Sequence, residues 1–314
     1  MKILITGIHG FVGSNLVAAL KGFHTVYGLD VVNPTTDGVQ KTFSWSEFDA
    51  IPPVDVIIHL AGKAHDTKNT TNAQVYFDVN TGLTKKIYDY FLESNASKFI
   101  FFSSVKAAAD SVVGDVLTED VIPAPKGSYG ESKIAAENYI LNQQSVGDKP
   151  NKRTYILRPS MIHGPGNKGN LNLLYKVVKQ GIPYPLGAFE NKRSFTSIDN
   201  LVFVIERLLE SEIATGIYNV SDDESLSTNE LIRLMANTMG KPSRIWKWNK
   251  SSVEFIARIG TILHLPLNSE RLQKLTENYV VSNSKLKRAL GVEKMPVSAS
   301  QGFVKTIKSF ENKL

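Results

Sequence analysis

The feature that most constrains this chain is a loop of three evenly spaced glycines directly after a short apolar run, residues 2–6. Gly7, Gly10 and Gly13 form a GxxGxxG loop, and helically spaced apolar residues follow it. Glycines between a strand and a helix let the backbone approach a phosphate closely, and the helix N-terminus adds N–H donors. A tight turn alone would also explain three glycines. The loop therefore predicts a dinucleotide site only in combination with its surroundings.

The surroundings alternate between strand-like and helix-like segments. Short apolar runs cover residues 2–6, 25–29, 54–60, 98–102 and 154–157, and helical periodicity covers roughly 72–94 and 130–144. Later helices are predicted at roughly 171–180, 199–211, 227–239 and 251–263. This order predicts an α/β fold: a Rossmann-type, doubly wound parallel sheet with a smaller C-terminal substrate-binding lobe. We assign residues 1–163 and 196–221 to the sheet domain, and 164–195 and 222–314 to the lobe.

An acidic residue and an absence of arginine indicate which dinucleotide is bound. Asp30 ends the second strand, 17 residues after Gly13, where an acid accepts hydrogen bonds from the adenosine ribose. Arginine usually holds the 2′-phosphate of NADP, and no arginine precedes Arg153. We therefore predict NAD, although Lys41 could soften this preference. The glycine loop, with Phe11 and Val12, is expected to contact it.

A tyrosine–lysine pair is the candidate for catalysis. Tyr129 and Lys133 form a YxxxK at the start of a predicted helix, 25 residues after Ser104. Residues i and i+4 share a helix face, so Lys133 is expected to lower the pKa of Tyr129. Such a tyrosine, beside a serine hydroxyl, can take the proton of an alcohol while a hydride leaves. A second YxxxK begins at Tyr175, but inside an apolar helix, where core packing is expected.

Further motifs follow in the order of a known superfamily. They are His59-Leu60-Ala61-Gly62, Asp78-Val79-Asn80-Thr81-Gly82, Ser103-Ser104, Arg158-Pro159 and Arg193-Ser194-Phe195. With them the chain resembles the extended short-chain dehydrogenases/reductases, in the NAD-dependent epimerase/dehydratase family that acts on nucleotide sugars. The resemblance runs almost end to end.

The resemblance implies a role for each matching residue. Ser104 aligns with the catalytic Ser/Thr position, Tyr129 is the acid/base, and Lys133 holds the nicotinamide ribose. The implied cofactor contacts beyond the glycine loop and Asp30 are Leu60, Ala61, Gly62, Asn80, Ser103, Tyr129 and Lys133. Asn80 has either a ribose-side or a structural role.

The chain departs from the family pattern at two places, one that concerns the type of reaction and one that concerns the contact with the adenine of the cofactor. Sugar-nucleotide 4,6-dehydratases carry an Asp-Glu pair after the catalytic threonine, whereas Val105 and Lys106 follow Ser104 here. A dehydratase is therefore disfavoured. Lys106 instead resembles a branch that includes hexosamine 4-epimerases and 4-keto-6-deoxyhexosamine reductases. The family's usual Asp-hydrophobic-x-Asp strand motif is also missing near residues 41–46.

The charge is divided unequally between the two halves. The chain carries +6, of which residues 1–152 contribute −3 and residues 153–314 contribute +9, with all nine arginines. No basic run suggests nucleic acid. A substrate diphosphate is the expected partner, because arginine binds its oxygens bidentately. The resemblance implies Ser104, Lys106, Asn170, Leu171, Arg193 and Arg271 as candidate substrate contacts, with the uracil base of a UDP-sugar at Asn170 and Leu171. The alternatives are surface ion pairs for the two arginines and a helix cap at Asn170.

Other compositional features exclude several kinds of site. The chain has no cysteine, and its six histidines show no metal-binding spacing. His65 could reach substrate or be an ordinary loop histidine. No stretch resembles a signal segment or a membrane span, which predicts a soluble cytoplasmic protein. The predicted helix 251–263 has apolar residues at 255, 256, 259, 262 and 263. It either faces the core or is an interfacial helix serving a lipid-linked sugar diphosphate.

These observations favour an NAD-dependent 4-epimerase of a UDP-hexose or UDP-N-acetylhexosamine, in the synthesis of surface polysaccharide sugars. The nearest rival is an NAD(P)H-dependent reductase of a UDP-4-keto-6-deoxyhexosamine. A 4-epimerase of a lipid-diphosphate-linked sugar and a non-catalytic dinucleotide sensor stay open as further alternatives. The intact Ser104, Tyr129 and Lys133 argue against the sensor. The family implies a homodimer through the helices at roughly 72–94 and 130–144.

Overall fold

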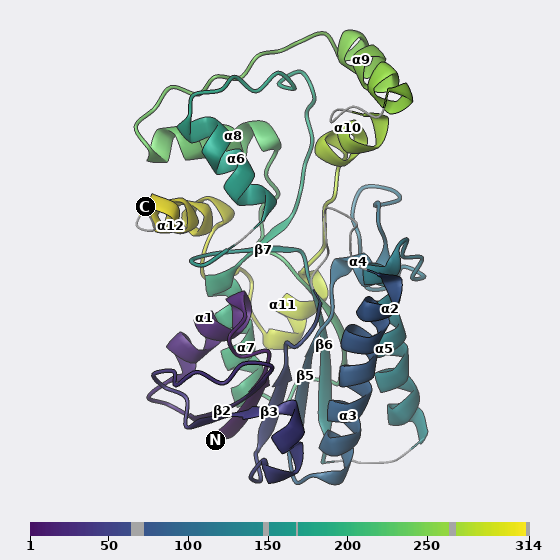
Figure 1. Ribbon diagram of the computed structural model, residues 1–314, viewed down its shortest axis with the longest axis vertical. Coiled ribbons are helices and arrows are strands. Elements are labelled where there is room, and N and C mark those ends of the chain that lie inside the picture. Colours follow the sequence, from purple (N-terminus) through teal and green to yellow (C-terminus); the bar gives the residue numbers. More distant parts are fainter. Residues whose placement is uncertain (64–71, 147–150, 168, 264–267, 312–314) are drawn as a thin grey trace.

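The computed structural model describes the chain except for residues 64–71, 147–150, 168, 264–267 and 312–314 (Figure 1). Its centre is a seven-stranded parallel sheet of order β3-β2-β1-β4-β5-β6-β9. The strands are β1 (Lys2–Thr6), β2 (Thr25–Asp30), β3 (Lys41–Ser44), β4 (Val56–His59), β5 (Lys98–Phe102), β6 (Arg153–Pro159) and β9 (Gly216–Val220). This strand order is that of a doubly wound dinucleotide-binding fold. The predicted fold class is confirmed.

Both faces of the sheet are buried, which explains the apolar strands. On β1, Ile3 and Ile5 pack on one face and Leu4 on the other, because successive side chains alternate. Helices α1 (Phe11–Leu20), α7 (Ile198–Glu210) and α11 (Ser284–Leu290) contribute to the first cluster. Helices α3 (Leu83–Glu93) and α5 (Ser128–Val146) contribute to the second (Figure 1). The sheet is therefore a fully covered layer whose carboxyl edge is left to bind ligands.

Several elements differ from the sequence expectation. Strand β3 forms at the edge of the sheet beside β2, although the family's motif is missing there. The expected helix 72–94 is divided into α2 (Ala73–Tyr76), a π-helical segment η2 (Phe77–Gly82) and α3. Short helices η1 (Trp45–Ala50) and α4 (Val105–Ala108) were not expected. Four to six residues give too few repeats for a periodicity to be visible in the sequence.

The C-terminal lobe stands on the carboxyl edge of the sheet. Its main core joins α6 (Asn170–Lys179), α8 (Thr228–Thr238) and α12 (Ala299–Glu311). Tyr175 is buried in this core, as expected for the second YxxxK. A smaller cluster joins α9 (Lys250–Ile262) to α10 (Ser269–Thr276). The domain boundaries given above stay a prediction.

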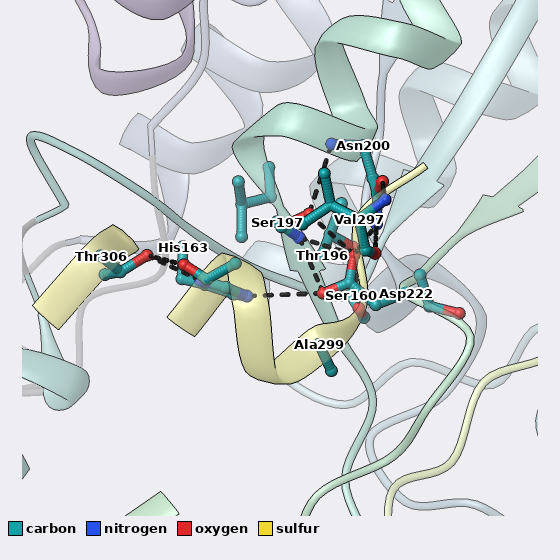
Figure 2. A network of polar contacts seen from close by, with 12 residues as sticks. Ser160, His163, Thr196, Ser197, Asn200, Asp222, Val297, Ala299 and Thr306 are labelled. Carbon is teal, nitrogen blue, oxygen red and sulfur yellow. Dashed lines mark hydrogen bonds and ion pairs between the residues drawn. The ribbon is translucent and has the colours of Figure 1, made fainter. Parts of the chain in front are cut away.

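A buried polar network joins the lobe to the sheet (Figure 2). Asp222, which follows β9, accepts hydrogen bonds from the Ser197 backbone N–H at 2.9 Å and from Asn200 Nδ2 at 2.7 Å. Its other oxygen lies 3.5 Å from His163 Nε2, and His163 Nδ1 lies 2.9 Å from the Thr306 hydroxyl of α12. The network spans β7 (Met161–His163), β8 (Phe195–Ser197), α7 and α12. It holds the lobe above the carboxyl ends of the strands.

Helix α9 shows the reverse of the core-facing expectation. Its buried residues are Val253, Ala257 and Gly260. The apolar residues singled out in the sequence are exposed: Phe255, Ile256, Ile259, Ile262 and Leu263. The helix packs through small residues against α10, so the larger side chains are left outside. In the part of the chain that the structure describes, no helix has both the length and the apolar character needed to cross a bilayer.

Candidate active site

The glycine loop is shaped by close approaches of the backbone. Gly7 has φ +68°, and a Cβ there would lie 2.8 Å from the Ala61 backbone nitrogen. A Cβ at Gly13 would lie 2.6 Å from the Ile8 carbonyl carbon. Gly10 is the N-cap of α1 and has no side chain to cap it. The first N–H groups of α1 are thus left to bind an anion, as a dinucleotide cradle requires.

A cavity of about 540 Å³ lies at the carboxyl ends of β1, β4, β5 and β6. It brings together these predicted residues: Gly7, Gly10, Phe11, Val12, Gly13, Leu60, Gly62, Ser103, Ser104, Lys106, Tyr129, Lys133 and Arg193. The edge where parallel strands end is the usual ligand site of an open α/β sheet. The cofactor cradle and the catalytic candidates therefore face one space.

Ser104, Tyr129 and Lys133 occupy one wall of this cavity. The side chains of Ser104 and Tyr129 are hydrogen-bonded to each other. The Lys133 ammonium is buried and donates to the Phe102 carbonyl at 2.9 Å. A Cβ at Gly62 would lie 3.1 Å from Lys133 Nζ, so glycine leaves room for the lysine. The arrangement places two hydroxyls and one ammonium beside the cofactor cradle.

The expected influence of Lys133 on Tyr129 is not what the structure shows. Burial is the strongest influence and raises the pKa of Tyr129, while the hydrogen bond with Ser104 lowers it. Burial also lowers the pKa of Lys133 to about 8, with Glu137 acting in the opposite direction. Lys133 is directed to the carbonyl at the end of β5, and desolvation disfavours the charged form of both groups. Lys133 is not among the groups that shift the pKa of Tyr129, so the expected lowering by Lys133 is not seen.

Three predicted cofactor residues lie outside the lining of the cavity, among the residues described. Asp30 accepts from the His9 backbone N–H at 3.0 Å and from the Val31 N–H at 2.7 Å, which orients its carboxylate at the end of β2. Ala61 lies against Gly7 through its backbone. Asn80 is fully buried; its Oδ1 accepts from the Lys63 N–H at 2.7 Å.

Asn80 acts as a structural residue by these contacts. Its Nδ2 donates to the Ser132 hydroxyl at 2.9 Å, which ties η2 to α5. The backbone carbonyl of Asn80 accepts a hydrogen bond from the Thr84 hydroxyl at 2.6 Å. Ser103 is engaged similarly, because its hydroxyl donates to the buried Glu137 carboxylate. Of the two roles that the sequence left open for Asn80, the contacts favour the structural one.

The predicted substrate residues are divided between the cavity wall and the lobe. Arg193 lines the cavity, donates to the Lys274 carbonyl at 2.8 Å, and has its pKa lowered by burial. Lys106 Nζ lies 3.7 Å from Asp110 and 4.6 Å from the ring centre of Tyr279. Arg271, on α10, is outside the described lining of this cavity.

The remaining substrate candidates lie at the start of α6. Asn170 is its first residue, and the Leu171 side chain is buried in the core of the lobe rather than in the cavity. The Leu171 side chain is therefore not available to a ligand in the cavity. His65 lies outside the described residues.

Some lining residues were missed by sequence reasoning. Met161 and Ile162 follow the end of β6, and Tyr279 follows α10. The strand end at Pro159 was a usable signal for the first two, since ligands gather where parallel strands end. Tyr279 reaches the site through a contact distant in sequence: its hydroxyl donates to the Ala109 carbonyl at 2.6 Å. No local pattern marks such a residue.

His59, at the end of β4, is a buried histidine whose protonation should make the stability of the protein depend on pH. Its Nδ1 lies 2.6 Å from the Thr6 hydroxyl and its Nε2 lies 2.9 Å from the Thr84 hydroxyl. Burial, with a smaller effect of Lys133, lowers the pKa of His59 from 6.5 to about 3. Below pH 6.5 His59 is therefore protonated in the unfolded chain, whereas in the folded protein it stays neutral down to about pH 3. Stability from this group is complete above pH 6.5 and is lost as the pH falls through that window.

We expect the wild type to lose about 1 kcal/mol per pH unit more than His59→Gln between pH 6 and pH 4. Urea unfolding of both proteins at the two pH values measures the difference. Equal slopes would show that His59 is not held neutral.

A glycine cradle facing a Ser–Tyr–Lys set at the edge of a doubly wound sheet defines a dinucleotide-dependent enzyme of the short-chain dehydrogenase/reductase class. Residues 3–221 match the NAD dependent epimerase/dehydratase family. The chain is also 31% identical to a UDP-glucose 4-epimerase of Vibrio cholerae, over 98% of this chain and 95% of that one. The protein belongs to this family, as the sequence predicted.

Two other relatives show the range of the family. A GDP-6-deoxy-D-mannose reductase of Pseudomonas aeruginosa is 26% identical over 75% of this chain and 79% of its own. The crystal structure of a UDP-glucuronic acid 4-epimerase from Bacillus cereus, in complex with NAD, has a TM-score of 0.73 with 21% identity. It covers 99% of both chains. The likeness to that structure concerns the fold.

Proposed function

We propose that the protein is an NAD-dependent 4-epimerase of a UDP-hexose or UDP-N-acetylhexosamine. The observation that carries the proposal is the hydrogen-bonded Ser104–Tyr129 pair, which opens on the same cavity as the glycine loop. The 31% identity with a UDP-glucose 4-epimerase over nearly the whole chain supports the choice of reaction.

The residues of the cradle fit NAD. Side chains at Gly7 and Gly13 would collide with the backbone, and α1 begins there without a side-chain cap. The glycine loop would hold the pyrophosphate, Asp30 the adenosine ribose and Lys133 the nicotinamide ribose. When bound, NAD supplies the reversible transfer of a hydride at sugar C4. The Asp30 carboxylate would repel a 2′-phosphate, which favours NAD over NADP.

The chain's own residues would manage the proton. Tyr129 takes the proton of the C4 hydroxyl and later returns it, so that the enzyme is regenerated in each turnover. The Ser104 hydroxyl shares the hydrogen bond and favours the tyrosinate, as its effect on the pKa of Tyr129 indicates. Arg193 and Lys106, both on the cavity wall, would neutralise a substrate diphosphate. A homodimer through α2, α3 and α5 is the assembly that we propose.

The test is to incubate the protein with UDP-N-acetylglucosamine or UDP-glucose and a trace of NAD. NMR should show the C4 epimer accumulating to equilibrium without net change in NAD. The second candidate is a reductase of a 4-keto-6-deoxy sugar nucleotide, which the identity with the GDP-6-deoxy-D-mannose reductase favours. Turnover of a 4-keto substrate alone, with equimolar NAD(P)H oxidation, would replace the epimerase by this reductase.

A further inference from the structure

Helix α9 exposes a continuous apolar surface. Its exposed apolar residues are Phe255, Ile256, Ile259, Ile262 and, directly after it, Leu263. Phe255 is 63% exposed and Ile262 is 75% exposed. Isolated exposed apolar residues are normal on protein surfaces, but a contiguous group marks an interaction site.

The helix has three separate faces. At about 100° per residue, the exposed apolar residues occupy one arc of the helix, and the buried Val253, Ala257 and Gly260 occupy another, about 130° away. Glu254 and Arg258 lie on the third, remaining arc of the helix. One face therefore binds α10 and the lobe, and a second apolar face has no core to enter in the described part of the chain.

The surroundings of this face are aromatic and basic. Trp246 and Trp248, just before α9, are about half exposed. From residue 246 to residue 275 the chain has five lysines and arginines and only two acids. Tryptophan favours the level of lipid headgroups, and basic residues are attracted to anionic lipids.

The same charge argues against a second copy of the chain. A twofold interface brings the same patch of both copies together, so two copies of this segment, each with a net charge of +3, would repel each other. An anionic bilayer offers the opposite charge and an apolar interior at one surface. The charge and the apolar face therefore favour a membrane.

The position of α9 agrees with docking at one end of the molecule. Figure 1 shows α9 at the end farthest from β2 and β3. The neighbouring α10 joins the cavity wall, because Arg193 donates to its Lys274 carbonyl and Tyr279 follows it. A docked α9 would hold the substrate cavity close to the membrane surface.

We propose that α9, together with Trp246 and Trp248, is a monotopic docking element that binds the surface of an anionic phospholipid bilayer. The apolar face enters the headgroup boundary, and the lysines and arginines around it contact the lipid phosphates. The element does not depend on the reaction that the cavity carries out.

Sedimentation with vesicles tests the proposal. Wild-type protein should bind vesicles of phosphatidylcholine with 30% phosphatidylglycerol, bind pure phosphatidylcholine more weakly, and be released in part by 0.5 M salt. Phe255→Ser/Ile259→Ser should reduce the bound-to-free ratio by about tenfold, because two apolar side chains no longer enter the bilayer. The matched control is Phe23→Ser/Ile122→Ser, which removes two exposed apolar residues elsewhere and should bind as the wild type does.

Circular dichroism and thermal unfolding establish that both double variants are folded. If the wild type binds neither the anionic vesicles nor those of pure phosphatidylcholine, the proposal is overturned. An equal loss in the control would also overturn it. A dimer that dissociates only in Phe255→Ser/Ile259→Ser, without vesicle binding, would show that a second copy covers the face instead.

Discussion

Replacing Tyr129 with phenylalanine is expected to lower kcat for the C4 epimerisation by about 1,000-fold, with little change in the affinity for NAD. The substitution removes one hydroxyl, which is the proposed carrier of the C4 proton and the partner of Ser104. The ring itself stays, so its edge contact with Tyr76, at 6.3 Å between centroids, is kept. The measurement is the NMR epimerisation assay, with NAD binding followed by fluorescence or calorimetry.

The chain supplies a matched control in its second YxxxK. Tyr175→Phe removes a hydroxyl that is buried without a hydrogen-bond partner among the described residues. It should keep full activity and leave stability unchanged or slightly higher, because no hydrogen bond is lost. Full activity in Tyr129→Phe would remove Tyr129 from the mechanism. A comparable loss in Tyr175→Phe would show that the assay responds to packing rather than chemistry.

Local patterns explain how much of the fold and site could be predicted. Strands β1 and β5 have the residue limits that the apolar runs indicated, because a buried parallel strand is a continuous apolar run. Gly7 and Gly13 were identifiable because their spacing reflects a backbone requirement that other residues cannot meet. The family membership followed from such motifs in their order along the chain.

What could not be predicted depends on contacts between distant segments. Helical spacing places Lys133 near Tyr129 but carries no information on burial, which decides the direction of both pKa shifts. Periodicity likewise identifies an apolar face on α9 without telling whether that face meets the rest of the protein. Tyr279 enters the cavity from 170 residues beyond its hydrogen-bond acceptor, Ala109. Each of these outcomes is fixed by tertiary packing.

Replacing Glu137 with leucine is expected to lower the free energy of unfolding by about 3–5 kcal/mol. Glu137 is fully buried and accepts from Arg158, at 3.0 Å from Nε and 2.5 Å from Nη2, and from the Ser103 hydroxyl. Without it the Arg158 guanidinium, 1% exposed, would be an unpaired charge in the core. Urea denaturation measures the change. Glu270→Gln breaks an exposed pair with Lys274 and should cost less than about 1 kcal/mol.

Removing both charges shows whether the loss of stability in Glu137→Leu comes from the unpaired arginine or from poorer packing. Glu137→Leu/Arg158→Met should regain most of the lost stability, because the desolvation penalty of an unpaired ion disappears. A double variant no more stable than Glu137→Leu would contradict this.

Glu137 also contacts the residues around the active site. It lies one helical turn after Lys133 on α5, and its carboxylate accepts a hydrogen bond from Ser103, which precedes Ser104. Glu137→Gln keeps the size and shape of the side chain but removes its charge. It should therefore lower kcat more than it raises KM, as expected of a residue that positions Ser104 beside Tyr129.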